Sequence, residues 1–216
     1  MSPSLLLPLL LVAPPDVPPP AVVPLTHQLS STNAVTRSRV ARELGALGAR
    51  AAAAVPHLAH ALTDRDPFVA RDAAEALGKI GPAAGPALRH ALTSQDRRVR
   101  LRALFALSQC CAKERPTVIA LVRMLKEDAD PEVRRWATLA LDRIGLTGHG
   151  LIANLTAALS DKDTSVRISA AVALGSYGAE AKEAVERLTP LAKGDNAALQ
   201  AAATEALKKI TAVAAK

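Results

Sequence analysis

The 216-residue sequence is 50% apolar and 22% charged, with a formal net charge of +7 and only 2% aromatic residues. Its apolar residues are mostly Ala, Leu and Val, which suits close helix–helix packing and argues against a β-sandwich. The two cysteines, adjacent at Cys110 and Cys111, exclude a disulfide-rich scaffold and a cysteine zinc site. No apolar run in the sequence approaches the roughly 20 residues that span a bilayer.

Residues 1–20 differ in composition from the rest of the chain. An apolar block at 4–12 is followed by a proline-rich stretch that ends at Pro20. A secretory signal requires a basic residue before its apolar block, but none precedes the block here, and Pro8 interrupts it. We therefore expect an apolar, proline-rich leader or linker on a cytoplasmic protein. Export through a signal segment cleaved after Ala13 is the alternative.

From residue 21 onward, a unit of about 33 residues recurs along the chain. Each copy places an Asn or Asp before a run that is rich in Ala and Leu. These positions are Asn33, Asp66, Asp96, Asp130, Asp163 and Asn196. So many copies at nearly constant spacing indicate a repeat protein.

The first half of each unit is predicted to be an amphipathic helix. In the unit at Asp66, one apolar stripe follows the helical period and consists of Val69, Ala73, Leu77 and Ile80. Asp66 is a natural N-cap, and Pro67 occupies the first helical position, where its missing N–H costs nothing. Glycines follow the stripes where a left-handed residue often ends a helix, at Gly48, Gly81, Gly145 and Gly178.

The second half of each unit is predicted to be another helix, anchored for example by Val55, Leu58 and Leu62. Neither helix can bury its stripe alone, so neighbouring units must stack against each other. We predict an all-α fold, an α-α superhelix that forms a right-handed solenoid of helix pairs. The predicted repeat domain is 21–216, with a half unit at 21–29, repeats at 30–62, 63–92, 93–125, 126–159 and 160–192, and a terminal helix at 193–216.

The repeat is similar to a known family. The frame that begins with Asp163, continues through Val166-Arg167 and ends at Gly175 and Gly178 resembles HEAT-like repeats, in the short bacterial form also found in phycobilin lyases. The resemblance covers about residues 21–210, although these units are shorter than the roughly 40–47 residues of other HEAT repeats. It implies a scaffold whose second helices line a concave face, with a bilin-lyase-like chaperone subunit as an alternative function.

An arginine recurs four residues after the capping Asn or Asp, at Arg37, Arg100, Arg134 and Arg167. The helical spacing predicts an i,i+4 pair between each arginine and its capping residue, which is a structural role. In HEAT-like repeats the corresponding Asp and Arg also bond between neighbouring units. A ladder that binds nucleic acid is the alternative.

A separate basic patch is predicted at Arg97, Arg98, Arg102 and Arg135. Such a cluster attracts phosphate groups or an acidic protein surface. No aromatic residue alternates with these arginines for base stacking, so a basic solenoid that binds nucleic acid is the second choice after a protein partner.

A polar column on the second helices is the predicted partner-binding surface. His27, His60, His90 and Arg123 each lie two residues before the last apolar anchor of a second helix, and His57 and Arg89 are their neighbours. Two residues correspond to about 200° around a helix, so these side chains should point away from the core. We expect them to bind a protein or peptide, acidic or extended, on the concave face. The alternative is that they are ordinary surface residues.

No catalytic pattern is present in the sequence. It contains no glycine-rich phosphate loop, no nucleophile elbow and no metal-ligand spacing. Deoxyhypusine hydroxylase, which has a similar architecture, binds iron through His-Glu pairs, and none of the five histidines here precedes a Glu. We expect Cys110 to be a buried, inert thiol and Trp136 to be part of the core. The prediction is a non-catalytic scaffold with no cofactor.

Overall fold

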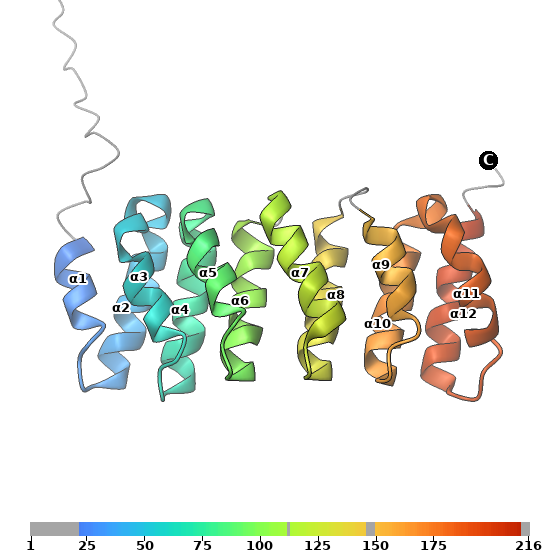
Figure 1. Cartoon of the computed structure of the whole chain (residues 1–216). Helices are drawn as coiled ribbons and strands as arrows, with labels where there is room; N and C mark the ends of the chain where they lie inside the picture. The colour runs from blue at the N-terminus through green and yellow to red at the C-terminus, as the bar shows by residue number, and fades with distance from the viewer. Residues whose placement is uncertain (1–21, 112, 146–149, 213–216) are drawn as a thin grey trace, which may run out of the picture.

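The computed structural model describes residues 22–111, 113–145 and 150–212. Within these ranges every regular element is a helix (Figure 1). This confirms the predicted all-α class. The predicted leader at 1–20 lies outside the described residues.

The helices alternate between two kinds along the chain. The first helices of the units are α2 (Ala34–Ala46), α4 (Pro67–Ile80), α6 (Arg97–Cys110), α8 (Pro131–Ile144), α10 (Thr164–Ser176) and α12 (Ala197–Ala212). The second helices are α1 (Val22–Gln28), α3 (Val55–Ala61), α5 (Gly85–Ala91), α7 (Arg115–Glu127), α9 (Leu151–Ala158) and α11 (Val185–Leu191). Short 3-10 helices lead into α3, α5 and α11, namely η1 (Gly48–Ala54), η2 (Pro82–Ala84) and η3 (Gly178–Ala184).

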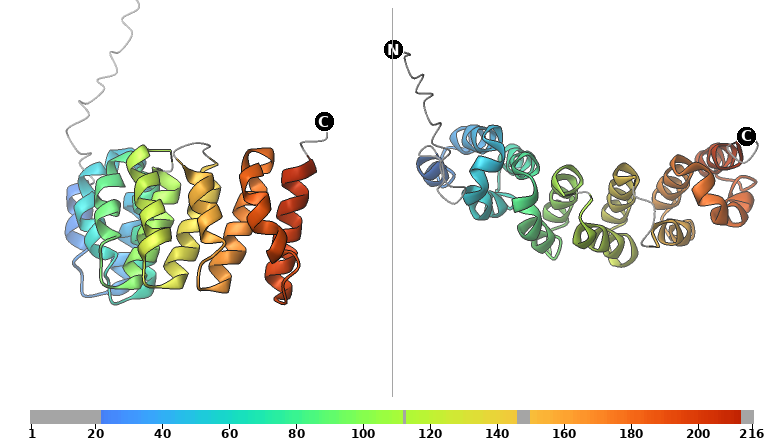
Figure 2. Two further views of the ribbon diagram at one scale, coloured as in Figure 1. Left: turned by 45° about the vertical axis from the view of Figure 1, so that its right-hand side comes forward. Right: turned by 90° about the horizontal axis from the view of Figure 1, so that it is seen from above.

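The helices stand in two rows that curve together into a solenoid (Figure 2). Seen from above, the first helices form the inner row of the arc and the second helices form the outer row. Neighbouring first helices pack directly against one another along the array. The second helices mainly contact the first helices and touch one another much less.

The concave face therefore belongs to the first helices, and the expectation that the second helices line it is wrong. Residue size explains the difference. A Cβ atom built on Gly45 of α2 would lie only 2.9 Å from the Ala76 Cα of α4, so the two backbones nearly touch. Small residues on the inner row allow closer approach there than on the outer row, and the array bends toward the inner side.

The helix starts follow the prediction. The Asp66 carboxylate accepts hydrogen bonds from the backbone N–H groups of Phe68 and Val69, at 2.9 and 3.3 Å, and Pro67 lies in the first turn. The other predicted caps accept backbone hydrogen bonds in a similar way: Asn33, Asp96, Asp130, Asp163 and Asn196. Each unit thus starts its inner helix with the same device.

The glycines after the stripes serve two kinds of turn. Gly81 and Gly145 cap α4 and α8, with φ angles of 90° and 59° that favour glycine. Gly48 and Gly178 also have positive φ, but each begins a 3-10 helix instead of capping an α-helix. In all four units the glycine lets the chain turn sharply from the inner row to the outer row.

One continuous hydrophobic core runs between the two rows. The predicted stripe from Val69 to Ile80 is buried, as are the second-helix anchors Leu58 and Leu62. Because each unit supplies only one layer of this core, its apolar surface is covered by the units on either side. The charged loops and the exposed faces of the two rows are therefore the places where function can reside.

Candidate functional site

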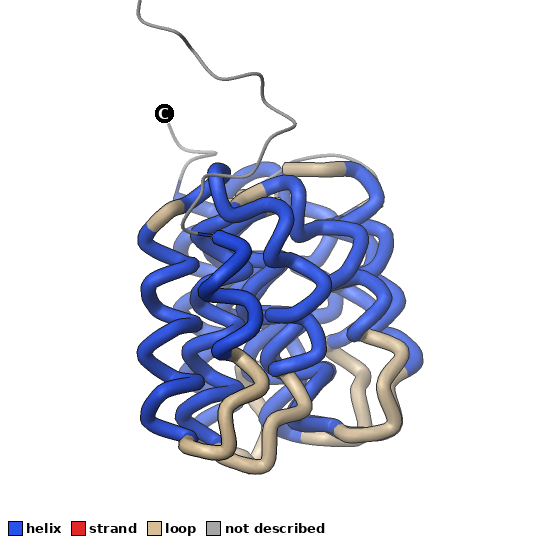
Figure 3. Tube along the Cα trace, turned by 90° about the vertical axis from the view of Figure 1, so that its left-hand side faces the viewer, coloured by secondary structure: helices blue, strands red, loops and turns tan. Residues whose placement is uncertain are grey.

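The arginines of the column donate hydrogen bonds to carbonyls of the loops that lead from one unit into the next. These loops are drawn in tan at the bottom of Figure 3. Three arginines form ion pairs with aspartates of the following unit. Arg37 pairs with Asp64 at 2.7 Å, Arg100 with Asp128 at 2.7 Å, and Arg134 with Asp161 at 2.8 Å. All three pairs are largely buried, so this column is a ladder that joins neighbouring units.

The structural interpretation of these arginines is right, and so is the bonding between neighbouring units that the resemblance implies, but the predicted i,i+4 pair with the capping residue is wrong. Each aspartate of the ladder lies two residues before the capping residue of the next unit, not four residues before the arginine. The arginine fits there because its other N–H groups donate to loop carbonyls, as Arg134 does to Asp128 and Ala129 at 2.9 and 3.2 Å. The hydrogen bond from Arg37 lowers the pKa of Asp64 against the opposing effect of burial.

The ladder is interrupted in two places. In the unit at Asp66 the arginine position is Ala70, and Ser94 stands where the other units have the paired aspartate. Arg167 keeps its bonds to the loop carbonyls of Asp161 and Lys162 and adds one to the Thr164 hydroxyl, but forms no ion pair among the described residues. Arginine and aspartate are thus absent together between α4 and α6.

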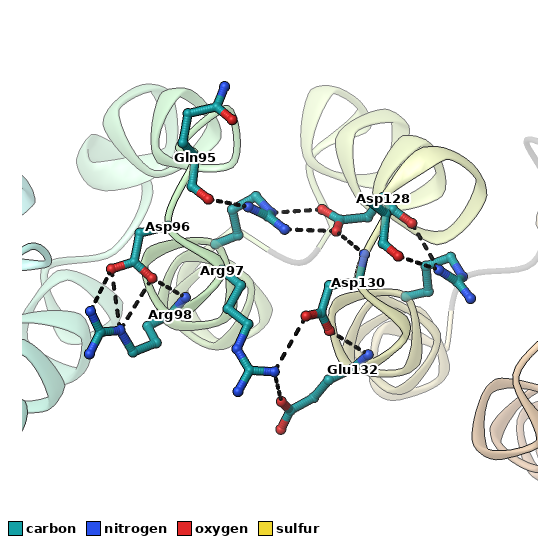
Figure 4. Close-up of polar contacts among 10 residues, drawn as sticks. Gln95, Asp96, Arg97, Arg98, Asp128, Asp130 and Glu132 are labelled. Atoms are coloured by element: carbon teal, nitrogen blue, oxygen red, sulfur yellow. Dashed lines mark hydrogen bonds and ion pairs between the residues drawn. The ribbon is translucent and has the colours of Figure 1, made fainter.

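Two arginines of the predicted basic patch are neutralised within the molecule (Figure 4). Arg97 of α6 reaches across to Asp130 and Glu132 at the start of α8, both at 3.3 Å. Arg98 turns back to the capping Asp96 at 2.9 Å. Both side chains are paired with nearby carboxylates and do not form a free cationic surface.

The other two arginines of the patch lie near the concave face. Arg102 of α6 donates a hydrogen bond of 2.8 Å to the Leu62 carbonyl at the end of α3. Burial lowers the pKa of Arg102, and the nearby charge of Arg98 adds to this effect. Arg135 of α8 places its guanidinium over the Trp136 ring, 5.5 Å from the ring centroid.

The predicted histidine column is exposed, but it lies on the outer row. His27 is on α1, His57 and His60 are on α3, His90 is on α5 and Arg123 is on α7, all solvent-exposed. Arg89 is half-buried and pairs with Glu114 at 3.1 Å. Their predicted direction, away from the core, is right. Their predicted placement on the concave face is wrong because the second helices form the convex side.

An apolar groove crosses the concave face where α4, α6 and α8 stand side by side. It has a volume of about 450 Å³, and its apolar lining comes from Pro67, Ala74, Leu101, Phe105 and Trp136. Arg71, Glu75 and Arg102 complete its walls. The described inner helices expose further apolar side chains at Val35, Phe68 and Val172. A surface of this kind on the inside of an arc can bind an extended chain.

The groove continues toward α2 as a more polar depression of about 270 Å³ that shares Arg71. Its central group is the buried Asp72, which accepts hydrogen bonds from Ser38 at 2.5 Å and from Arg71 at 3.0 Å. Arg42 also pairs with Asp72, at 3.5 Å. The charges in this part of the concave face are therefore neutralised by one another.

The sequence interpretation missed the groove residues. Trp136 is 37% exposed and lines the groove, so its assignment to the core is wrong. The helical period contained a usable signal for Phe105. It lies two residues from the stripe residues Ala103 and Leu107, about 200° around the helix, which places it off the buried stripe. In the structure it is partly buried at the edge of the core and also lines the groove.

The cysteine pair also departs from expectation. Cys111, which stands where other units have a turn glycine, is buried, whereas Cys110 is only partly buried. The two sulfur atoms are bonded to each other as a vicinal disulfide at the end of α6. The expectation of an inert thiol at Cys110 is therefore wrong.

No helix among the described residues is both long and apolar enough to cross a membrane. No group of three or more His, Cys, Asp or Glu side chains in the described ranges is placed to hold a metal ion.

Comparison with known proteins establishes the family. The model for HEAT repeats matches residues 22–108, 85–149 and 118–208, so the chain belongs to the HEAT repeat family. This confirms the resemblance drawn from the repeat frame. The chain matches no curated protein.

Solved structures of the same architecture include natural and engineered proteins. An engineered protein is 27% identical, with 89% of this chain and 97% of that chain covered and a TM-score of 0.53. The complex of CpcE and CpcF of phycocyanin lyase from Nostoc sp. PCC7120 is 26% identical, with coverage of 93% and 80% and a TM-score of 0.55. A designed armadillo repeat protein in complex with the peptide (KR)4 is 20% identical, with coverage of 88% and 99% and a TM-score of 0.57.

Proposed function

We propose that this chain is a non-catalytic HEAT-repeat scaffold that binds a protein or peptide partner in the concave groove over α4, α6 and α8. The observation that carries the proposal is the cluster of solvent-accessible apolar side chains there, Leu101, Phe105 and Trp136, in a groove of about 450 Å³. When a partner covers such a cluster, the binding free energy becomes more favourable by about 25 cal/mol for each Å² of apolar surface removed from water. Scattered apolar residues on a surface are ordinary, but a grouped set inside a groove marks a binding site.

The architecture favours a partner that extends across several units. The groove spans three inner helices, and each helix is held in place by the continuous core behind it. A rigid surface loses little conformational freedom on binding, so more of the contact free energy appears as affinity. An extended peptide or an exposed protein segment matches this geometry better than a compact small molecule, because the groove is open along the array.

A basic solenoid for nucleic acid is the weaker alternative. Nucleic-acid affinity depends on cations that are free to contact phosphates, and Arg97 and Arg98 are already bonded to carboxylates. Arg37, Arg100 and Arg134 are also committed to aspartates of the ladder. Most of the arginines that suggested a phosphate-binding surface therefore have structural partners.

The test is selection of binding peptides from a random 12-residue library displayed on phage, using the full chain as bait. Selected peptides are labelled with fluorescein, and their affinities for the native protein and for a Phe105→Ala/Trp136→Ala variant are measured by anisotropy. We expect the double substitution to weaken binding at least tenfold, because it removes the apolar lining of the groove.

A matched control replaces His60, His90 and Arg123 together with Ala on the convex face. Peptides that bind in the groove should keep their affinity for this variant within twofold. Peptides that bind this triple variant poorly but bind the Phe105→Ala/Trp136→Ala variant with native affinity would overturn the proposal. Affinity for a DNA or RNA duplex that exceeds peptide affinity and falls steeply with salt would favour the nucleic-acid alternative.

A further inference from the structure

The arginines of the concave face fall into two sets according to whether a carboxylate of the chain neutralises them. In the polar depression near α2, Arg42 and Arg71 share the buried Asp72, and Arg71 also lies 3.7 Å from Glu75. At the start of α6, Arg98 pairs with Asp96. A partner that approached these groups would compete with carboxylates that are already in place.

Arg135 is different from its neighbours. The arginines around it, Arg97 and Arg134, are paired with carboxylates, whereas Arg135 forms no ion pair within the described part of the chain. Its guanidinium lies over the Trp136 ring, and Trp136 lines the groove. A guanidinium held over an aromatic ring by a cation–π contact still has N–H groups that can donate to another acceptor.

Arg102 adds a second positive charge without a carboxylate partner. It lines the groove and is half-buried, and its observed acceptor is the neutral carbonyl of Leu62. The groove thus combines an apolar lining with Arg102 in its wall and Arg135 beside it over the Trp136 ring, and neither guanidinium forms an ion pair with a described carboxylate. This local excess of positive charge agrees with the net charge of +7 for the whole chain.

From these contacts we infer the chemistry of the partner, an inference that rests on the proposed function of the groove. We propose that the bound segment places a bulky apolar side chain against Leu101, Phe105 and Trp136, and an aspartate or glutamate within two residues of it that pairs with Arg135. The spacing follows from geometry. The Arg135 guanidinium is 5.5 Å from the Trp136 ring centroid, and an extended chain advances about 3.3–3.6 Å per residue.

Charge and stacking together give this pair its specificity. A carboxylate can accept two parallel N–H bonds from the edge of a guanidinium. An amide of the same shape carries no negative charge and so binds the guanidinium more weakly. The ring beneath the guanidinium restricts its rotation, so less conformational freedom is lost on binding. A lysine or arginine at the same place in the partner would meet Arg135 and Arg102 and be repelled.

The experiment uses peptides selected from the displayed library that depend on Trp136. Each peptide is resynthesised with its acidic residue changed to the matching amide, and both forms are measured against the native protein and Arg135→Gln. We expect the amide peptide to bind the native protein at least threefold more weakly than the acidic peptide does. On Arg135→Gln the amide peptide should bind no more weakly than the acidic peptide. Arg135→Glu should prefer a peptide with lysine in place of the acid.

The matched control is Arg123→Gln, which removes the same charge from the convex face and should leave the preference for the acidic peptide unchanged. Equal affinity of the acidic and amide peptides, or selection of lysine beside the apolar residue, would overturn this inference while leaving the groove as the binding site. Failure to recover any peptide that depends on Trp136 would instead overturn the proposed function, and this inference with it.

Discussion

The inner helices approach one another more closely at the two ends of the array than in its middle. At one end, a Cβ on Gly45 of α2 would lie 2.9 Å from the Ala76 backbone, and at the other, a Cβ on Gly175 of α10 would lie 3.0 Å from the Ala206 backbone. In the middle, α6 and α8 carry Ser108 and Asp142 at this repeat position. The middle pair of inner helices accordingly packs less extensively than the pairs at the ends.

The difference shows how one repeat is adapted to two purposes. Glycine at the contact position lets two inner helices close against each other, which stabilises the array but leaves little room between them. Larger residues hold α6 and α8 further apart, and the groove lined by α4 and α6 reaches this looser region at Trp136 of α8. In this region Arg97 and Arg100 of α6 form ion pairs with the start of the α8 unit, across helices that pack less extensively than those at the ends.

The largest expected effect is therefore on an ion pair of the middle. Arg100 of α6 pairs with Asp128 before α8, and the two side chains are 13% and 4% exposed. Arg100→Ala leaves Asp128 buried without its cationic partner, and we expect the free energy of unfolding to fall by about 3 kcal/mol. Urea denaturation followed by circular dichroism measures this change.

The control for that prediction is Arg97→Ala. Arg97 joins the same two helices through Asp130 and Glu132, but its side chain is 57% exposed. We expect a loss of less than about 1 kcal/mol, because exposed ion pairs contribute little. Equal losses for the two variants would show that the buried pair does not hold the middle of the array together.

A smaller effect is expected from closing the space at an end. Gly45→Ala places a methyl group against the Ala76 backbone, which cannot move aside as a flexible side chain can. We expect a loss of about 1–3 kcal/mol from overpacking. Gly78→Ala should cost less, because its Cβ would meet the Gln109 side chain at 3.3 Å.

Ser108→Ala tests the same repeat position in the middle. Because α6 and α8 are further apart there, the substitution should change the free energy of unfolding by less than about 0.5 kcal/mol. The three variants are compared by thermal and urea unfolding. Destabilisation of the Ser108 variant equal to that of the Gly45 variant would contradict the difference between ends and middle.

The repeat architecture was predictable because the same local sequence signals recur in each unit. Capping residues such as Asp66, the stripe from Val69 to Ile80 and the turn glycines all agree on helix starts, faces and ends, and the structure follows them. Agreement among several copies removes the ambiguity that a single helix pattern would leave.

The candidate site was less predictable because curvature is not a local property. Whether the inner row consists of first or second helices depends on contacts between units, such as Gly45 against Ala76, that the period of one helix does not reveal. The histidine column was consequently assigned to the wrong face. The ladder partner Asp64 was missed for a related reason, since it is 27 residues from Arg37 and meets it only after stacking.

Acid should weaken the ion pairs between units before it affects the packing of their glycines. The pKa of Asp64 is lowered from its usual value of 3.8, chiefly by the hydrogen bond from Arg37. A lowered pKa in the folded state gives stability that is complete above pH 3.8 and is lost as the pH falls through the folded value. Burial acts to raise the pKa of Asp161, but hydrogen bonds, the strongest of them from Arg134, leave this pKa lowered. The stability that Asp161 contributes is therefore also lost as the pH falls.

We therefore expect the free energy of unfolding to decline as the pH is lowered from 5 toward 2.5, with a shallower decline in Asp64→Asn. The measurement is urea denaturation at several pH values in constant salt. Leu58→Ala serves as the control, because it destabilises the core and should shift the whole curve without changing its slope. An unchanged slope in the Asp64 variant would show that this pair is not linked to protonation.

Only a small effect on stability is also expected from Trp136→Ser in the middle of the array. Trp136 is 37% exposed and lines the groove, so its removal takes less apolar area from the core than removal of a fully buried side chain does. We expect a change within about 1 kcal/mol, whereas Leu141→Ala on the buried face of the same helix should cost about 2–5 kcal/mol. If Trp136→Ser unfolds the chain as easily as Leu141→Ala, the ring supports the solenoid, and any loss of peptide binding by that variant would reflect a damaged fold. A stable Trp136 variant means instead that the loose middle carries its aromatic side chains for a partner and not for its own cohesion.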